Sequence, residues 1–238
     1  MRLGLGGGLG VHGGRRAIPV WRPTRLTSLK AYYPPAGITI TSNKVSAVAD
    51  ASASGFNLSQ GNAGLRPGVT TLAGRQGMSC AAGTFLVGNA ASIVTTRYTI
   101  AAVLRPTVVE SGTYMFSVIG SDFVGGVALL NNATRGLIHA NVATGTDGSE
   151  TLAAELWIAT WDGAAVSLRI NGVAQSLSTP PGSFTAPGAG CQISIGAFAS
   201  GTLGSSVDVF EPLVCNAVLS AADLARLERY YLGEYGIA

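Results

Sequence analysis

The chain has 238 residues, of which 47% are hydrophobic and only 11% charged, and its formal net charge is +3. A chain of this length can fold as one all-β sandwich with a sizeable core, and its 33 glycines supply tight turns. The three cysteines exclude a disulfide-stapled scaffold, and no apolar run is long enough to span a bilayer. Because so little charge keeps copies of the chain apart, we expect a homo-oligomer.

Residues 1–27 are expected to form an extended, glycine-rich arm and linker. Seven glycines interrupt residues 1–16, which argues against a stable helix and against a secretory signal peptide. The arm would contact a partner through four apolar and two basic residues: Leu3, Leu5, Leu9, Val11, Arg15 and Arg16.

The basic residues are concentrated near the start of the chain. Seven of them precede Asp50, the first acid, and the remaining chain carries 8 bases against 12 acids. This basic segment could contact an acidic protein or nucleic acid, and of these two partners we expect the protein. The alternative is that the segment is a solvated tail without a partner.

Short strands separated by turn residues follow one another about every ten residues, a spacing typical of a sandwich or barrel. The predicted strands cover residues 38–41, 44–50, 56–60, 69–72, 77–81, 85–87, 97–106, 113–119, 124–130, 136–142, 192–198 and 207–215. The clearest is 97–106, in which alternate residues from Tyr98 to Leu104 share one apolar face and Pro106 ends the strand.

Residues 154–175 form the centre of the predicted fold. Residues 156–161 are apolar on both faces, which indicates a strand inside a sandwich. Asp162-Gly163 predicts a two-residue hairpin turn to a half-buried strand over 166–170, and Asn171-Gly172 predicts the next turn.

The end of the sequence predicts one short amphipathic helix over 220–235. Ser220 and Asp223 fit a capping box, Leu224, Leu227 and Tyr231 follow at helical spacing, and Gly236 ends the helix.

Three stretches resemble the laminin-G-like, or concanavalin A-like, lectin and glucanase jelly rolls of bacterial and phage proteins. They are the opening SLKAYYPPAGITITSNKVSAVAD, the central TWDG and VSLRINGV, and the terminal LSAADLARLERYYLGEYGIA. The resemblance covers roughly residues 28–238, although the tryptophan usual before the acid at Asp50 is absent. It implies an all-β fold: a two-sheet antiparallel jelly-roll sandwich over 28–238, with the extended arm before it and the helix at its end.

Catalysis by this fold class uses a strand of the type E-x-D-x-x-E, which this chain lacks. Glu150 and Glu155 are five residues apart, which would put them on opposite faces of a regular strand, and we interpret them as surface carboxylates. The two histidines, His12 and His139, lie in no recognisable triad, and there is no zinc cluster, P-loop or EF-hand loop. We therefore expect no catalytic residues and no enzyme.

Many laminin-G-like domains bind Ca²⁺ and glycans at rim loops, so that resemblance makes weak ligand-binding candidates of Asp122, Asn131, Asn132 and Asp147. Asp162 is better explained by its turn, and Trp157, Trp161 and Tyr114 are expected in the core because they lie within strands. We expect no metal or other cofactor, with Ca²⁺ as the open alternative. Cys191 and Cys215 are either paired or, as we expect, buried free thiols.

The resemblance and the arm together suggest a non-enzymatic structural protein of a bacteriophage or prophage particle. It would be a virion decoration, neck or tail-fibre-associated subunit, bound to other virion proteins through its arm and not to a membrane. The alternative is a carbohydrate-binding module that recognises host surface glycans. A divergent glycosidase that uses Glu150 or Glu155 ranks last.

Overall fold

The structure, a computed structural model, describes residues 21–91, 93, 96–120, 126–139, 142–178, 187, 190–198 and 201–238, without the side chains of residues 143 and 147. Up to residue 106 the elements are η1 (Pro23–Arg25), β1 (Leu29–Tyr32), η2 (Pro35–Gly37), β2 (Ile38–Thr41), β3 (Lys44–Val48), β4 (Leu58–Ser59), η3 (Ala63–Leu65), β5 (Gly68–Leu72), β6 (Arg75–Cys80), β7 (Leu86–Asn89) and β8 (Tyr98–Pro106). They continue with β9 (Thr113–Gly120), β10 (Gly126–Asn131), β11 (Thr134–His139), β12 (Val142–Ser149), β13 (Glu155–Trp161), β14 (Val166–Ile170), β15 (Val173–Gln175), β16 (Cys191–Ile195), β17 (Val207–Cys215) and α1 (Ala221–Tyr235).

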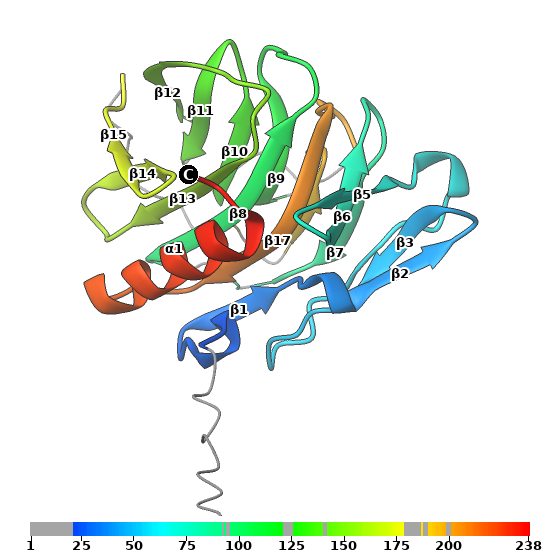
Figure 1. The fold of residues 1–238 in the computed structure, drawn as a ribbon, viewed down its shortest axis with the longest axis horizontal. Coiled ribbons are helices and arrows are strands. Elements are labelled where there is room, and N and C mark those ends of the chain that lie inside the picture. Colours follow the sequence, from blue (N-terminus) through cyan, green and yellow to red (C-terminus); the bar gives the residue numbers. More distant parts are fainter. Residues whose placement is uncertain are drawn as a thin grey trace, which may run out of the picture.

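The described strands pair antiparallel and join into one hydrogen-bonded network that curls into a barrel-like sandwich (Figure 1). One half runs β15–β14–β13–β8–β17, and the other runs β7–β16–β9–β10–β11–β12. Strands β6, β5, β3 and β4 connect the halves, and a bridge between Thr146 of β12 and Leu177 joins the two free ends. The all-β fold with one C-terminal helix is therefore confirmed. The finer prediction of two separate jelly-roll sheets is not, because these pairings close the sheet on itself.

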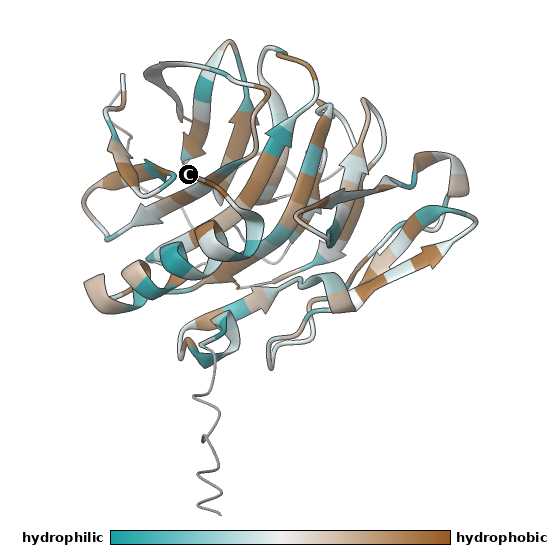
Figure 2. Ribbon diagram, viewed as in Figure 1, coloured by the Kyte–Doolittle hydropathy of each residue, from teal (hydrophilic) through white to brown (hydrophobic). Residues whose placement is uncertain are grey.

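The central strands are buried on both faces, which explains their apolar sequences. One face of β8 and β13 contributes Tyr98, Ile100, Trp157 and Ala159 to the core inside the sandwich. The opposite face contributes residues such as Val103 and Ile158 to a second core, which helix α1 covers. Figure 1 shows α1 lying across β8, β13 and β17, and Figure 2 shows brown, hydrophobic residues predominating along these central strands. A third cluster, around Phe198, lies on the outer side of β9 and β10.

Of the two turns that flank β14, the sequence predicts one correctly and the other wrongly. Asn171 and Gly172 both have positive φ, at 50° and 81°, and link Ile170 to its partner Val173 in the two-residue turn that the sequence predicts. The two-residue turn predicted at Asp162-Gly163 is wrong, because Trp161 pairs with Val166 and four residues lie between them. The Asp162 carboxylate accepts hydrogen bonds from the amides of residues 164 and 165, at 2.8 Å each, and so stabilises the longer loop.

The prediction also missed β12, since it treated residues 136–142 as one strand. The structure divides that stretch between β11 and β12. The sequence of β12, VATGTDGS, has few apolar residues, so its alternation is too weak to show a strand.

Helix α1 begins and ends as the sequence predicts. The Ser220 hydroxyl accepts a hydrogen bond from the amide of Asp223 at 3.1 Å, and Gly236 closes the helix in the left-handed region at φ 63°. Among the described helices, none has the length and apolar character needed to cross a bilayer. The three cysteines are buried and free. This confirms the prediction of buried free thiols and excludes the alternative of a Cys191–Cys215 disulfide.

Candidate functional site

The residues predicted to bind a ligand do not form one site among the described residues. Asp122 and all six residues of the predicted contact arm lie outside that part of the chain, and of Asp147 only the backbone, in β12, is described. Asn131 is fully buried and holds a loop: its amide donates to the carbonyl of Val108 at 2.7 Å and to the Ser205 hydroxyl at 3.3 Å. Asn132 lies in the β10–β11 turn, where its side chain accepts a hydrogen bond from the next amide. In the described part of the chain, no three His, Cys, Asp or Glu side chains lie close enough together to hold a metal ion.

Two hollows open in the described surface instead, one beside helix α1 and one between η2 and the start of β6. The first, which we call the tryptophan hollow, has a volume of about 260 Å³ and is lined by Trp21, Arg226, Arg229, Tyr230, Gly233 and Glu234. The second, the proline hollow, has a volume of about 470 Å³ and is lined by Arg22, Pro34, Pro35, Ala36, Gly74, Arg75 and Gln76. We call the two together the groove.

The hollows meet at two places. Trp21 and Arg22 are consecutive residues that line one hollow each. Glu234 of the first hollow is ion-paired with Arg75 of the second, at 2.5 Å. The two hollows are therefore neighbours, and the half-buried Trp21 lines the first of them.

The helical part of the groove follows from the spacing of α1. Arg226, Tyr230 and Gly233 recur at intervals of four and three residues, and Arg229 lies three after Arg226 and four before Gly233, so they share one stripe of the helix. The Trp21 ring meets the Tyr230 ring edge to face, with centroids 6.0 Å apart, which holds the tryptophan against this stripe.

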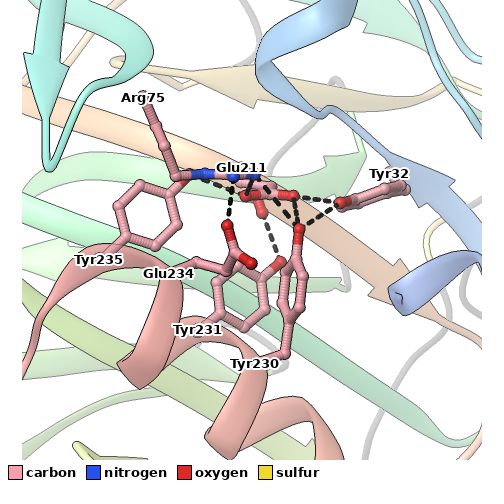
Figure 3. Close-up of polar contacts among 7 residues, drawn as sticks. All are labelled: Tyr32, Arg75, Glu211, Tyr230, Tyr231, Glu234 and Tyr235. Carbon is pink, nitrogen blue, oxygen red and sulfur yellow. Dashed lines mark hydrogen bonds and ion pairs between the residues drawn. The ribbon is translucent and has the colours of Figure 1, made fainter. Parts of the chain in front are cut away.

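A buried polar network centred on Glu211 supports the groove from beneath. The Glu211 side chain, which is fully buried, accepts hydrogen bonds from Tyr230 at 2.7 Å, from Tyr235 at 2.8 Å and from Tyr32. Arg75 completes the set with an ion pair at 2.8 Å. Figure 3 shows the helix tyrosines rising toward Glu211, with Tyr32 and Arg75 approaching from opposite sides. Every oxygen of this buried carboxyl thus has partners.

A bulge in β17 aims Glu211 at these partners. The pairing of β17 with β8 shifts register between Phe210 and Leu213, and Glu211 itself has a φ of 50°. A left-handed conformation of this kind costs about 1–2 kcal/mol in a residue other than glycine. Its backbone carbonyl accepts a hydrogen bond from the Tyr231 hydroxyl at 2.6 Å, so the helix holds the bulge on both its backbone and its side chain.

The tyrosines of this network act as hydrogen-bond donors and not as nucleophiles. Burial, together with a hydrogen bond to Glu211 and its charge, raises the pKa of Tyr230 to about 12. Burial and the same carboxylate raise the pKa of Tyr32 far above its usual range. Because each phenol keeps its proton at physiological pH, the network's role is to fix Tyr230 and Arg75 in the groove wall.

The interpretation of Glu150 and Glu155 as surface carboxylates on opposite faces of a strand is wrong. Glu150 follows β12 and Glu155 begins β13, and their exposed fractions are 8% and 5%. Glu155 accepts hydrogen bonds from Arg135 at 3.0 and 2.5 Å and from the indole of Trp157 at 3.3 Å. Neither oxygen of Glu150 has a hydrogen bond of regular geometry to the part of the chain that the structure describes. Burial and the nearby Glu155 charge raise the pKa of Glu150 to about 7.

The other residues considered from the sequence are structural. Trp157, Trp161 and Tyr114 are in the core as expected, with exposed fractions of 5% or less. His139 is fully buried, its Nδ1 lies 2.7 Å from the hydroxyl of Tyr98, and burial lowers its pKa to about 4.

The groove was not predicted from the sequence, although the sequence holds two signals for the network beneath it. An acid and a proline interrupt the otherwise apolar end of VDVFEPLVC, which indicates a bulge and a buried carboxyl. Three tyrosines crowd the end of the helix, more hydroxyl groups than an apolar face needs.

The fold and the groove define a class: a barrel-like antiparallel β-sandwich with a C-terminal helix and an arginine-rich groove beside it. No family model matches the sequence, and no curated protein matches it either. Solved structures do share the fold. A Trypanosoma rangeli sialidase in complex with the inhibitor DANA is 16% identical, with a TM-score of 0.60, over 86% of this chain and 33% of its own. This chain thus spans about a third of that sialidase.

Two further structures are similar. Domain 4 of AbnA, a GH43 extracellular arabinanase from Geobacillus stearothermophilus in complex with arabinotriose, is 13% identical with a TM-score of 0.62, over 84% of this chain and 98% of its own. An arabinofuranosidase complexed with arabinofuranosyl-alpha-1,2-xylobiose is 13% identical with a TM-score of 0.63, over 81% of this chain and 51% of its own. At such identities the likeness establishes the fold alone.

These findings correct two predictions. The bacteriophage structural role is contradicted, because the three solved structures named above are of a sialidase, an arabinanase domain and an arabinofuranosidase. The expectation that the chain is not an enzyme is contradicted too, because those structures belong to glycosidases.

Proposed function

We propose that the chain is a carbohydrate-binding domain that takes a saccharide in the groove beside helix α1. One observation carries this proposal: the half-buried face of Trp21 forms a wall of a hollow whose other walls present guanidinium and carboxyl groups. A sugar ring has apolar C–H faces that pack on an aromatic ring, and hydroxyl groups at its edge that pair with planar charged groups. The hollows, at about 260 and about 470 Å³, are of the size that suits small ligands.

The rigidity of the groove supports the same proposal. Tyr230 and Arg75 are both fixed by Glu211, so two of the groove's walls are ordered before any ligand arrives. A preformed site loses less entropy on binding and is therefore more selective. The arabinanase domain, which the match covers almost entirely, is a domain seen with a bound oligosaccharide.

The test is binding of the full chain to a glycan array, followed by calorimetry on the glycans that bind. Trp21→Ala should weaken binding by roughly thirtyfold, since a sugar face covering about 80 Å² of the ring contributes about 2 kcal/mol. Trp21→Phe is the matched control, because it keeps an aromatic face and should retain most of the affinity. Thermal melts of both variants check that the fold is intact.

The results separate the function from the site. If the chain binds no glycan, the proposed function is wrong. If it binds glycans and Trp21→Ala binds them equally well, carbohydrate binding stands and the groove is not the site.

We also propose that the sandwich is of the laminin-G-like kind. The support is local: strands β13, β14 and β15 form over the TWDG and VSLRINGV stretch, and α1 forms over LSAADLARLERYYLGEY. An experimental structure in which β6 separates from β17 and the bridge between Thr146 and Leu177 opens, leaving two sheets, would agree with this proposal. One that keeps the closed network would reject the two-sheet jelly roll.

Hydrolysis of a glycosidic bond is a second candidate, which the Glu150–Glu155 pair favours. Glu150 keeps its proton to about pH 7, as a general acid must, whereas Glu155 is ion-paired with Arg135. Glycoside hydrolysis needs two carboxyl groups that divide the roles in this way. Reducing-sugar release from the bound glycans, abolished in both Glu150→Gln and Glu155→Gln, would establish it. Neither residue lines the groove, so binding and hydrolysis can be tested separately.

A further inference from the structure

The charge of the groove is strongly one-sided. Four arginines line its two hollows, against one carboxyl group: Arg22, Arg75, Arg226 and Arg229 against Glu234. Outside the groove the balance is reversed, since the rest of residues 21–238 carries 8 bases against 11 acids. The groove therefore concentrates positive charge on a sandwich that is otherwise mildly acidic.

Two of these arginines are neutralised by the protein itself. Arg75 is ion-paired with Glu211 at 2.8 Å and with Glu234 at 2.5 Å. Arg226 is ion-paired with Asp223 at 3.0 Å. Both guanidinium groups therefore have carboxylate partners before a ligand binds.

The other two arginines, one in the lining of each hollow, have no such partner among the described residues. Arg22 and Arg229 are exposed, and the side chain of neither makes an ion pair or hydrogen bond within the described part of the chain. An arginine fork matches the two oxygens of a carboxylate, and the charge-assisted pair is about twice as strong as a neutral hydrogen bond.

We propose that the saccharide bound in the groove is acidic, with carboxylate groups that pair with Arg22 and Arg229 while a sugar ring packs on Trp21. This inference rests on the proposed carbohydrate function and names the class of its ligand. A carboxylated saccharide has a ring face, which can pack on Trp21, and a carboxylate, which can accept two hydrogen bonds from an arginine.

Glu234 favours a saccharide over a nucleic acid. It lies where the two hollows meet, with a side chain that is 36% exposed. A sugar hydroxyl can donate a hydrogen bond to this carboxylate, whereas a continuous phosphate backbone would place negative charge against it.

The test uses the full chain and matched pairs of glycans that differ only in charge. The probes are oligogalacturonates with their methyl esters, and sialylated oligosaccharides with their desialylated forms. We expect at least one acidic member to bind about tenfold or more tightly than its neutral partner, and this preference to fall as salt is raised from 0.05 to about 0.5 M. Arg22→Gln and Arg229→Gln should each weaken that binding about tenfold. Arg97→Gln, an exposed arginine that lines neither hollow, should leave it unchanged.

Three results would overturn the inference. Equal binding of acidic and neutral partners would refute it while leaving the proposed carbohydrate function in place. Binding of no glycan at all would refute both. A single-stranded oligonucleotide that binds more tightly than every acidic glycan, and that loses binding in the same two variants, would assign the groove to nucleic acid instead.

Discussion

The buried carboxyl group of Glu150 makes a prediction about stability that is independent of any ligand. Its exposed fraction is 8%, and neither of its oxygens has a hydrogen bond of regular geometry to a described residue. Burial and the charge of Glu155 raise its pKa from the ordinary 4.5 to about 7, although the amides of Thr151 and Asn132 and the charge of Arg135 offset part of the rise. That difference corresponds to about 3 kcal/mol between the protonated and ionised forms.

The sign follows from which state keeps the proton. Between pH 4.5 and about 7 the folded protein holds a proton on Glu150 that the unfolded chain has lost. The free energy of unfolding therefore falls as pH rises through this window and is about 3 kcal/mol lower above it. Glu150→Gln cannot ionise, so relative to the wild type it should be near neutral at pH 4.5 and more stable by up to about 3 kcal/mol at pH 8.5.

Urea denaturation of both proteins at pH 4.5, 5.5, 6.5, 7.5 and 8.5 measures this difference directly. Glu110→Gln is a control of opposite sign. Glu110 is partly buried, but hydrogen bonds from Thr113 and Ser206 lower its pKa, so its loss should destabilise the protein at neutral pH and matter less in acid. A Glu150→Gln difference that stays flat with pH, or that grows toward acid, would refute the reasoning.

Three further changes test the packing that shapes the groove. Glu211→Gln should lower the free energy of unfolding by about 3 kcal/mol in urea denaturation, because it removes the buried carboxylate that pairs with Arg75 and accepts three tyrosine hydrogen bonds, although Glu234 still pairs with Arg75. A loss below about 1 kcal/mol would show that the network does not anchor the helix. Ser220→Ala should cost about 1 kcal/mol in the same assay and Ser220→Gly only a few tenths, since glycine is itself a tolerable cap. Gly77→Ala should lower the free energy of unfolding by about 1–3 kcal/mol, because the new Cβ would lie 2.3 Å from Cδ1 of Phe210. Gly61→Ala is the control and should have no comparable effect, because its Cβ would have no atom within 4 Å.

The sequence predicted features that depend on neighbouring residues. The turn at Asn171-Gly172 and the cap at Ser220 are set within a few residues by conformational preference and local hydrogen bonds, and both formed as predicted. The strand over 156–161 was recognised because burial on both faces leaves an apolar sequence on both faces.

Features that depend on distant partners were missed or mistaken. The closure of the barrel between β12 and β15 depends on a bridge from Thr146 to Leu177, thirty-one positions apart, which no local pattern marks. One hollow needs Trp21 to meet α1, and the other needs the segments around Pro34 and Gly74 to meet each other, so the residues of the groove have no common spacing in the sequence.

The Glu211 bulge connects the stability of the fold with the shape of the groove. A left-handed glutamate and a buried carboxyl group each cost free energy, so the bulge persists only while Tyr32, Arg75 and the helix tyrosines surround it. Those same contacts fix Tyr230 against Trp21 and hold Arg75 against Glu234, where the two hollows meet. Because the groove's walls are also the partners of the strained residue, a variant that releases Glu211 should loosen both the C-terminal helix and the binding surface.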